Sequence, residues 1–417
     1  MPEKPAAKNQ IQKQKTSKVS IAVFLATLVA VLISLVSVLF PALVASSVSN
    51  IPEFVGLESV LPEPFEVGVL AIPLVAANII SGAVAILYFK KVLPQQLLKA
   101  INFVFSFEVS KRTAFVVMIV LLAVYVIATT SEITSEETWL DYKAVKERVQ
   151  TWTVDDVTKR FEVHVRYLLL SVSLDWFGNI RLLPFVASIA LVVLVYYITK
   201  EIAKKRFAGL VAVVLVLQSN LFLSYDTSAT YDNLWILLYL FSLYMIYKRW
   251  ALLSPVPYIL SIPSKALTAL FIPMSLFFIY RADMPKKRKI YTIIIYAAMV
   301  FIGLAITSAL NVNLAGTAVA FNEVAFWQGF TSMAFQLRFD VVVVLFLLPL
   351  IVGLFIASRH GITQADSIMA LIAGILFTAP LLTGFTDQTN QPYRFVPLVV
   401  FFAMGAGAIL SKRTIQA

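Results

Sequence analysis

SEITSEETWLDYKAVKERVQTWTVDDVTKRFEVHVR, residues 131–166, is the one long polar stretch between apolar segments of this chain. Four acidic residues at its start, Glu132, Glu136, Glu137 and Asp141, fall within ten residues of the end of an apolar run. Carboxylates just above a membrane surface are well placed for base chemistry on a lipid-borne substrate. We therefore interpret 131–166 as an extracytoplasmic loop that holds an active site. The alternative is a solvated loop whose charges keep it in water.

The same stretch contains a pattern typical of an amphipathic helix. Aromatic and aliphatic residues recur at steps of three and four, which places them on one helical face and the charged residues off it. Such a helix is expected to lie flat on the membrane interface. The apolar face consists of Trp139, Tyr142, Val145, Val149 and Trp152.

The composition of the 417 residues is that of a membrane protein. Hydrophobic residues make up 60% of the chain and charged residues 14%, far from the balance of a soluble globular domain. The chain has no cysteine, which excludes a disulfide framework, a thiolate metal site and a cysteine nucleophile. The net charge of +11 fits cytoplasmic loops that face anionic lipid.

Apolar runs of about 17–25 residues, the length that crosses a bilayer, recur along the chain. They predict an all-α polytopic membrane protein with about 12 transmembrane helices and an outer-face loop that carries amphipathic interfacial helices. The run at 167–199 is clearly long enough only from about residue 181. The predicted spans are 19–45, 67–89, 113–130, 167–199, 207–223, 233–247, 251–263, 265–280, 289–309, 340–358, 367–384 and 394–411.

The distribution of charge predicts the orientation of these spans. With a cytoplasmic N-terminus, the inner segments hold 24 of the 34 Lys and Arg residues, and all but five of the 23 acidic residues lie outside. This agrees with the positive-inside rule and places both termini in the cytoplasm. The basic residues form short flanks and no patch with aromatic platforms, so a nucleic-acid partner is not indicated.

Three regions follow from this pattern. Residues 1–18 are a basic cytoplasmic tail, followed by an apolar run too long for a signal-peptide core. Residues 19–112 are an accessory helix pair and a cytoplasmic interfacial helix near 92–110. Residues 113–417 are the functional transmembrane core, with the outer loop 131–166.

From about residue 113 the chain resembles the C-type glycosyltransferase superfamily, which includes protein O-mannosyltransferases and aminoarabinose lipid A transferases. The resemblance is one of order and pattern over some 300 residues. An acidic pair precedes a Tyr-bearing helix, a His element enters a span, and a Lys lies at the mouth of a short helix pair. The residues that carry it are Glu136-Glu137, Tyr142, His164, Phe177-Gly178, Arg181-Leu182, the loop 224–232, Lys265 and Tyr393-Arg394-Phe395-Val396-Pro397.

The resemblance implies transfer of a sugar from a polyisoprenyl-phosphate donor to a lipid, glycan or protein acceptor on the outer face. It also implies that the configuration at the anomeric carbon is inverted. A first-loop carboxylate would act as base, with Glu137 the first choice, then Glu136 and Glu132. The superfamily usually has Asp there, and the prolines that follow its His element are missing here, at His164-Val165-Arg166. These departures keep a non-catalytic scaffold as an alternative.

A substrate-binding set follows from the same argument. A departing lipid phosphate needs cations, and Arg can bind phosphate oxygens with two parallel donors while Lys acts as a point charge. Arg166 and Arg181 could equally be snorkelling flanks, and the two aspartates could be helix caps. The predicted set is Lys265, Arg394, Tyr393, His164, Arg166, Arg181, Asp226 and Asp232.

No cofactor or metal is predicted. His164 has no Cys or His neighbour at ligand spacing, and no Asp-X-Asp motif supports a divalent ion. A transporter or flippase of a lipid-linked substrate is the remaining alternative. Such a protein would have charges buried in mid-span and helices broken by Gly or Pro, whereas most ionisable residues here lie at the ends of spans.

Overall fold

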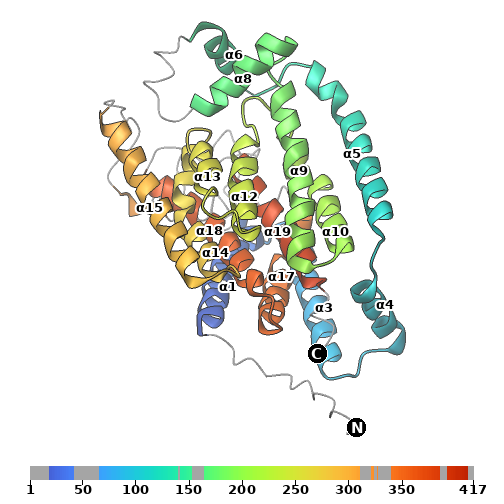
Figure 1. The fold of residues 1–417 in the computed structure, drawn as a ribbon. Coiled ribbons are helices and arrows are strands. Elements are labelled where there is room, and N and C mark those ends of the chain that lie inside the picture. Colours follow the sequence, from blue (N-terminus) through green and yellow to red (C-terminus); the bar gives the residue numbers. More distant parts are fainter. Residues whose placement is uncertain are drawn as a thin grey trace, which may run out of the picture.

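The computed structural model describes residues 18–41, 65–139, 141–152, 164–309, 321–323, 326, 340–385 and 392–411. Regular structure within these ranges is helical throughout, as the sequence predicted. Figure 1 shows a bundle with two helices lying across one end. The helices are α1 (Lys18–Leu39), α3 (Ala71–Phe89), α4 (Gln95–Ser106), α5 (Lys111–Thr134), α6 (Tyr142–Thr151), α8 (His164–Phe177), α9 (Leu182–Ala203), α10 (Arg206–Leu217), α11 (Asn220–Leu223), α12 (Leu234–Tyr247), α13 (Pro255–Ser261), η1 (Ala266–Phe271), α14 (Ile272–Arg281), α15 (Lys286–Ala309), α17 (Val341–Arg359), α18 (Thr363–Phe385), η3 (Pro392–Phe395) and α19 (Val396–Ile409).

Six helical segments in the described ranges are long and apolar enough to cross a membrane, and they make the chain an all-α membrane protein. They are Lys18–Leu39, Ala71–Phe89, Lys111–Thr134, Leu182–Ala203, Val341–Arg359 and Pro392–Ile409. Two other predicted spans are shorter helices: α10 has 12 residues and α12 has 14. At 1.5 Å per residue they cover about 18–21 Å, less than the roughly 30 Å of a bilayer core. Twelve crossings therefore stay a prediction.

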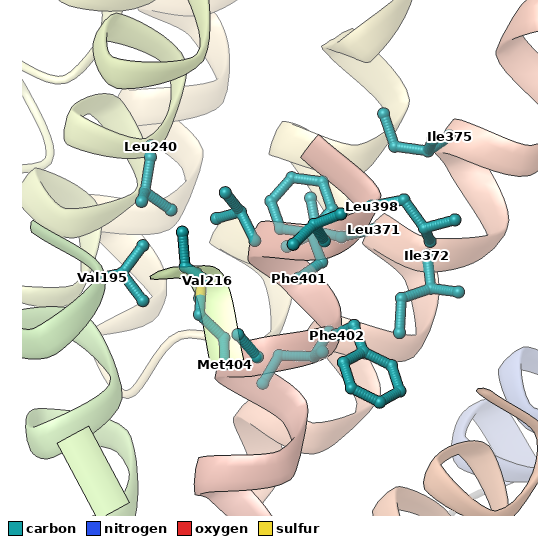
Figure 2. Packing of buried hydrophobic residues seen from close by; sticks show 14 of the residues in the cluster. Val195, Val216, Leu240, Leu371, Ile372, Ile375, Leu398, Phe401, Phe402 and Met404 are labelled. Carbon is teal, nitrogen blue, oxygen red and sulfur yellow. The ribbon is translucent and has the colours of Figure 1, made fainter. Parts of the chain in front are cut away.

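The core of the bundle is built around α19, which packs against α9, α10, α17 and α18. Figure 2 shows Phe401 and Phe402 of α19 among aliphatic side chains of the neighbouring helices. Small residues permit this close approach. A Cβ atom at Gly407 would overlap a methyl carbon of Thr199 in α9 and lie 2.8 Å from the carbonyl oxygen of Ala208 in α10.

The first helix is part of this core. α1 lies against α17 and α18, and two hydroxyl groups on α1 reach α18. Ser20 donates a hydrogen bond to Asp366 at 2.7 Å, and Thr27 donates one to the carbonyl oxygen of Met369 at 3.1 Å. Helix α3 in turn packs against α17. Both of the first two predicted spans thus contact helices from the end of the chain.

α6 and α8 lie across one end of the bundle, called here the α6 end (Figure 1). The predicted amphipathic helix exists as α6, and its expected position at the membrane interface stays a prediction. Tyr142 and Val145 are buried against Leu170 of α8 and Ile180, so its apolar face covers protein. Trp139 precedes α6 instead of lying on it.

Candidate functional site

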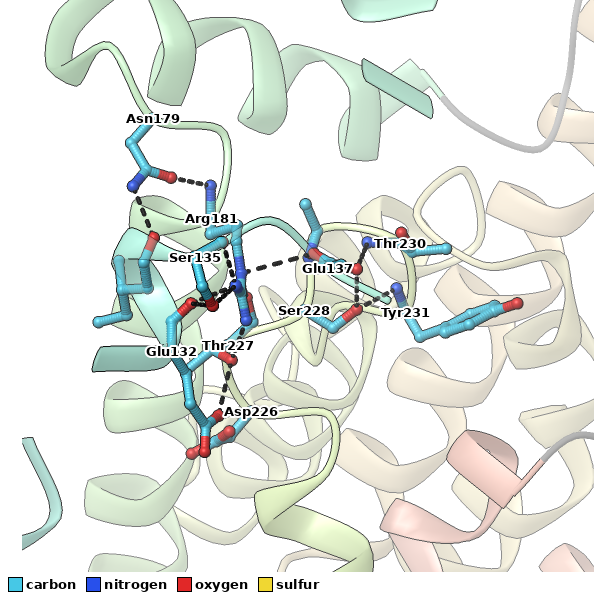
Figure 3. Close-up of polar contacts among 12 residues, drawn as sticks. Glu132, Ser135, Glu137, Asn179, Arg181, Asp226, Thr227, Ser228, Thr230 and Tyr231 are labelled. Carbon is cyan, nitrogen blue, oxygen red and sulfur yellow. Dashed lines mark hydrogen bonds and ion pairs between the residues drawn. The ribbon is translucent and has the colours of Figure 1, made fainter. Parts of the chain in front are cut away.

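Loop 224–233, between α11 and α12, is the place at the α6 end where distant segments meet. Glu137 reaches it from the segment after α5 and accepts hydrogen bonds from the backbone N–H of Ala229 at 2.5 Å and of Thr230 at 3.4 Å. The hydroxyl of Ser228 donates to the same carboxylate at 3.0 Å (Figure 3). Only 2% of the Glu137 side chain is exposed. The loop therefore encloses a carboxylate that the sequence nominated as a base.

Arg181, directly before α9, holds the same loop from the other side. Its Nε donates to the carbonyl oxygen of Thr227 at 3.0 Å and lies 3.6 Å from a carboxylate oxygen of Glu137. Its remaining donors reach the Thr227 hydroxyl at 2.7 Å, the Ser135 carbonyl at 2.6 Å and the Glu132 carbonyl. Because these partners occupy the guanidinium on every side, Arg181 acts here as a clamp that joins three segments.

Arg166 of α8 holds the far end of the loop. It donates to the carbonyl oxygens of Ala229, at 2.9 Å, and Thr230, and its Nε lies 3.2 Å from the Asp232 carboxylate. Asp232 also accepts a hydrogen bond from the backbone N–H of Leu234 at 3.0 Å, the first residue of α12. Burial raises the pKa of Asp232, against the opposing charge of Arg166. The pair of Arg166 and Asp232 thus fixes the entry of α12.

Asp226 is a buried carboxylate in the same loop, and neither of its carboxylate oxygens has a hydrogen bond of good geometry within the described residues. The hydroxyl of Tyr125 lies beside it, and the carboxylate of Glu132 is close enough to repel it. Burial, reinforced by Glu132, raises the pKa of Asp226 to about 7. An aspartate with this pKa changes its charge near neutral pH.

This raised pKa predicts a pH-dependent stability. A carboxyl group in an unfolded chain titrates near pH 4, so the folded state binds the Asp226 proton more tightly than the unfolded state does. The melting temperature should therefore fall as the pH rises from about 5 through about 7. Asp226→Asn should remove this component and melt at a higher temperature than the wild-type protein at pH 8, measured by thermal unfolding in detergent.

The control for this experiment is Asp141→Asn. Asp141 is exposed and accepts a hydrogen bond from the Tyr231 hydroxyl at 2.9 Å, so this variant changes the same kind of group without touching the buried carboxylate. It should keep the pH dependence of the wild-type protein. Parallel melting curves for wild type and Asp226→Asn across this pH range would contradict the assignment.

An aromatic group connects the loop to the start of the last span. Tyr231 stacks on Tyr393 with ring centroids 4.4 Å apart and planes at 14°, and Trp139 stacks on Tyr225 at 5.2 Å and 16°. Trp139 and Tyr231 also meet edge to face at 5.5 Å. These rings bring the segment after α5, loop 224–233 and η3 into one aromatic cluster.

Two predicted cations adjoin this aromatic cluster. The ammonium nitrogen of Lys265 lies 4.6 Å from the centroid of the Tyr393 ring, within the range of a cation–π contact. The guanidinium carbon of Arg394 lies 5.7 Å from the same centroid, and Arg394 is buried. Lys265 also acts electrostatically on Asp232. The structure thus brings Lys265, Tyr393 and Arg394 next to the loop that encloses Glu137.

Glu136 and Glu132 lie outside the enclosure around Glu137, and the side chain of His164 lies outside the described residues. Glu136 points into solvent, with 67% of its side chain exposed, and forms an ion pair with Lys146 at 2.7 Å. Glu132 is exposed but accepts a hydrogen bond from the Thr227 hydroxyl at 3.3 Å. His164 begins α8, and its side chain lies outside the described residues. Of the three carboxylates nominated as the base, only Glu137 is enclosed by the loop.

Sequence reasoning missed the residues that organise the site. It singled out the aspartates of SYDTSATYD, residues 224–232, but gave no role to Thr227, Ser228, Tyr225 or Tyr231. The density of hydroxyl and aromatic residues in this short loop was the available signal, since Ser and Thr readily hydrogen-bond to nearby polar groups.

Comparisons with known proteins add no relatives. Within the described ranges, no group of three or more His, Asp and Glu side chains is placed to hold a metal ion. No protein-family model, no curated protein and no solved structure matches this chain.

Proposed function

We propose that the chain is a membrane glycosyltransferase that moves a sugar from a polyisoprenyl-phosphate donor to a lipid, glycan or protein acceptor. One observation carries the proposal: a buried carboxylate, Glu137, shares one end of the bundle with an aromatic cluster and with the cations Lys265 and Arg394. These groups come from segments up to 257 positions apart in the sequence. A transfer of this kind needs a base, a surface for the sugar and positive charge for the leaving phosphate.

In this proposal Glu137 is the general base. The Ser228 hydroxyl already donates to its carboxylate at 3.0 Å and marks the direction from which an acceptor hydroxyl would approach. The acceptor oxygen attacks the anomeric carbon and its proton passes to Glu137. The bond from the anomeric carbon to the phosphate oxygen breaks with its electron pair, and the lipid phosphate leaves. Because Glu137 is enclosed, the loop around Ser228 has to move when the acceptor binds.

Lys265 is the first choice for the leaving phosphate. Its ammonium faces the Tyr393 ring, and the structure gives it no ion pair within the described residues. Arg394 lies at the same ring and is the second choice. Arg166 and Arg181 already bind the carbonyl oxygens of loop 224–233, so we assign them to positioning the loop. Contact of Arg166 and Arg181 with the phosphate of the donor stays a prediction.

The proposal includes a topology. The sorting of basic residues supports cytoplasmic termini and about twelve crossings, with the α6 end facing outward. On the outer face there is no supply of nucleotide sugars, which is the reason to propose a lipid-linked donor that reaches the site through the bilayer. The long apolar helices around the site are compatible with that route.

A second candidate function is supported by one observation. The carboxylate of Glu137 and the donors of Arg181 are bound within the protein, as they would be in a scaffold with no reaction to perform. A scaffold subunit of a membrane complex would need the loop to stay closed, whereas the enzyme needs it to open. The two functions therefore differ in whether purified protein turns over a donor.

The test is a transfer assay with purified protein in detergent. The donor is a radiolabelled polyprenyl-phosphate sugar, offered as a panel of hexoses and pentoses, and a membrane extract supplies acceptors. We expect the label to leave the lipid fraction and appear on an acceptor. If the folded protein turns over none of these donors, the scaffold function is favoured and the enzyme is contradicted.

A further inference from the structure

A cavity of about 790 Å³ lies among the ends of α9, α12 and α14 and the start of α18. It is far from the Glu137 site, because α9 begins directly after Arg181 and ends at the cavity with Ala203. The 22 residues of α9 rise by about 33 Å, the thickness of a bilayer core. The cavity therefore opens at the end of the bundle opposite to the α6 end.

Its lining is strongly basic. Five cations line it against two carboxylates, those of Glu201 and Asp283. Lys and Arg are commonly enriched at the cytoplasmic ends of membrane spans. Here the cations come from four different parts of the chain and surround one cavity. They are Lys204, Lys248, Arg249, Arg281 and Lys289.

The protein neutralises some of these cations but not all. Glu201 pairs with Lys248 at 2.9 Å and with Lys204 at 3.7 Å. Arg281 pairs with Asp366, a buried residue of α18 that also accepts the hydrogen bond from Ser20. These contacts tie α14 and α1 to α18 and account for three of the five cations.

Arg249 and Lys289 form no ion pair within the described residues. Lys289 donates a hydrogen bond to the carbonyl oxygen of Tyr280 at 2.6 Å, Arg281 is close enough to repel it, and the carboxylate of Asp283 attracts it without forming an ion pair. Arg249 is exposed and forms no ion pair within the described residues. Two cations that line one cavity without an ion pair are the arrangement expected where an anion binds.

We propose that this cavity binds a phosphate-bearing anion through Arg249 and Lys289, with the Arg281 guanidinium beside them. An Arg guanidinium can donate hydrogen bonds to two phosphate oxygens at once, and a Lys ammonium supplies a point charge. The volume falls in the range of small-molecule sites, so it has room for more than a bare phosphate ion. Tyr247 and Tyr280 offer apolar surface to the rest of the ligand. The source is an anionic lipid headgroup or a soluble phosphate compound.

The experiment compares two double variants of the full chain in zwitterionic detergent. Arg249→Gln/Lys289→Gln removes two charges from the cavity. Lys286→Gln/Lys287→Gln removes two exposed charges from the adjoining start of α15, outside the cavity lining. The lipid probe is phosphatidylglycerol against phosphatidylcholine, counted by native mass spectrometry. The soluble probe is pyrophosphate, measured by calorimetry.

We expect the wild-type protein and the α15 control to bind one or both phosphate probes, and the cavity variant to bind about tenfold more weakly or worse. Retention of phosphatidylglycerol alone identifies a lipid headgroup, and binding of pyrophosphate identifies a soluble ligand. Equal binding by all three proteins, equal loss in both variants, or binding of neither probe overturns the proposal. If the double variant does not fold, the exposed single variant Arg249→Gln carries the same comparison.

Discussion

Glu137→Gln is expected to lower sugar transfer by about a hundred- to ten-thousand-fold, the usual contribution of a positioned general base. Gln keeps the shape of the side chain but cannot take the acceptor proton. The adjacent residue Glu136 is exposed to solvent and pairs with Lys146, so the Glu136→Gln variant should transfer sugar at the wild-type rate. Two adjacent carboxylates with opposite surroundings thus provide a matched pair. The measurement is the initial rate with a radiolabelled polyprenyl-phosphate sugar.

Folding has to be monitored alongside the rate. Gln at position 137 also weakens the contact with Arg181 and places an amide near the N–H of Ala229. The rates are therefore compared per folded molecule, with thermal unfolding as the check. Glu137→Asp keeps a carboxylate and should retain part of the activity. Equal rates for Glu137→Gln and Glu136→Gln in folded protein would remove Glu137 from the reaction.

Arg181→Met is expected to destabilise the protein by about 3–5 kcal/mol, the range found when one partner of a buried ion pair is removed. Only 7% of the Arg181 side chain is exposed, and Met leaves the Glu137 carboxylate buried without its cation. It also frees the carbonyl oxygens of Ser135 and Thr227, which lose their donor. The result should be a lower melting temperature and a more easily cleaved loop 224–233, measured by thermal unfolding and limited proteolysis.

Two comparisons define this prediction. Arg148→Met removes the same side chain from an exposed position on α6 and should change the melting temperature little. Arg181→Lys keeps the charge but loses the planar fork that reaches several acceptors, so its stability should lie between wild type and Arg181→Met. A melting temperature for Arg181→Met equal to that of Arg148→Met would show that the clamp does not stabilise the fold.

The long spans were predictable because a run of about twenty apolar residues leaves few alternatives. α5 and α17 lie within a few residues of their predicted positions, and α9 matches the second part of the run at 167–199, from about residue 181. The first part of that run belongs to α8, which lies across the end of the bundle (Figure 1). The run at 207–223 was predicted as one span, but α10 ends at Leu217, and the buried residues Leu221 and Phe222 belong to the separate four-residue helix α11. The run at 233–247 matches α12 to within one residue. The length of an apolar run therefore does not show whether it forms one helix or two.

The choice between Glu136 and Glu137 was beyond the sequence for a geometric reason. Both residues lie in the non-helical segment after α5. Consecutive side chains of an extended chain point to opposite sides, so one of the two faces loop 224–233 and the other faces solvent. Which one turns inward depends on the positions of Arg181 and Ala229, far along the chain. Only tertiary structure fixes that.

The pattern of α6 was also read correctly only in part. Periodicity shows that a helix has an apolar face, but it does not say whether lipid or protein covers that face. Here Leu170 of α8 covers Tyr142 and Val145. The basic cavity at the opposite end could not be predicted for a similar reason. The sequence shows cations at the ends of spans, but only the fold determines which of them line the same cavity.

The central claim is that loop 224–233, which encloses Glu137, and the Tyr393–Arg394 segment form one centre. The chain has no natural cysteine, so the double variant Tyr231→Cys/Tyr393→Cys contains only two thiols, at positions whose rings stack at 4.4 Å. A disulfide needs Cα atoms within about 7 Å of each other, which ring stacking does not ensure, so the thiols are joined with a short bifunctional maleimide. We predict a crosslink within the chain, and none in Tyr231→Cys/Tyr247→Cys, whose second thiol lies at the other end of α12. No crosslink in the first pair, while each single thiol reacts with a small monofunctional maleimide, would contradict this arrangement.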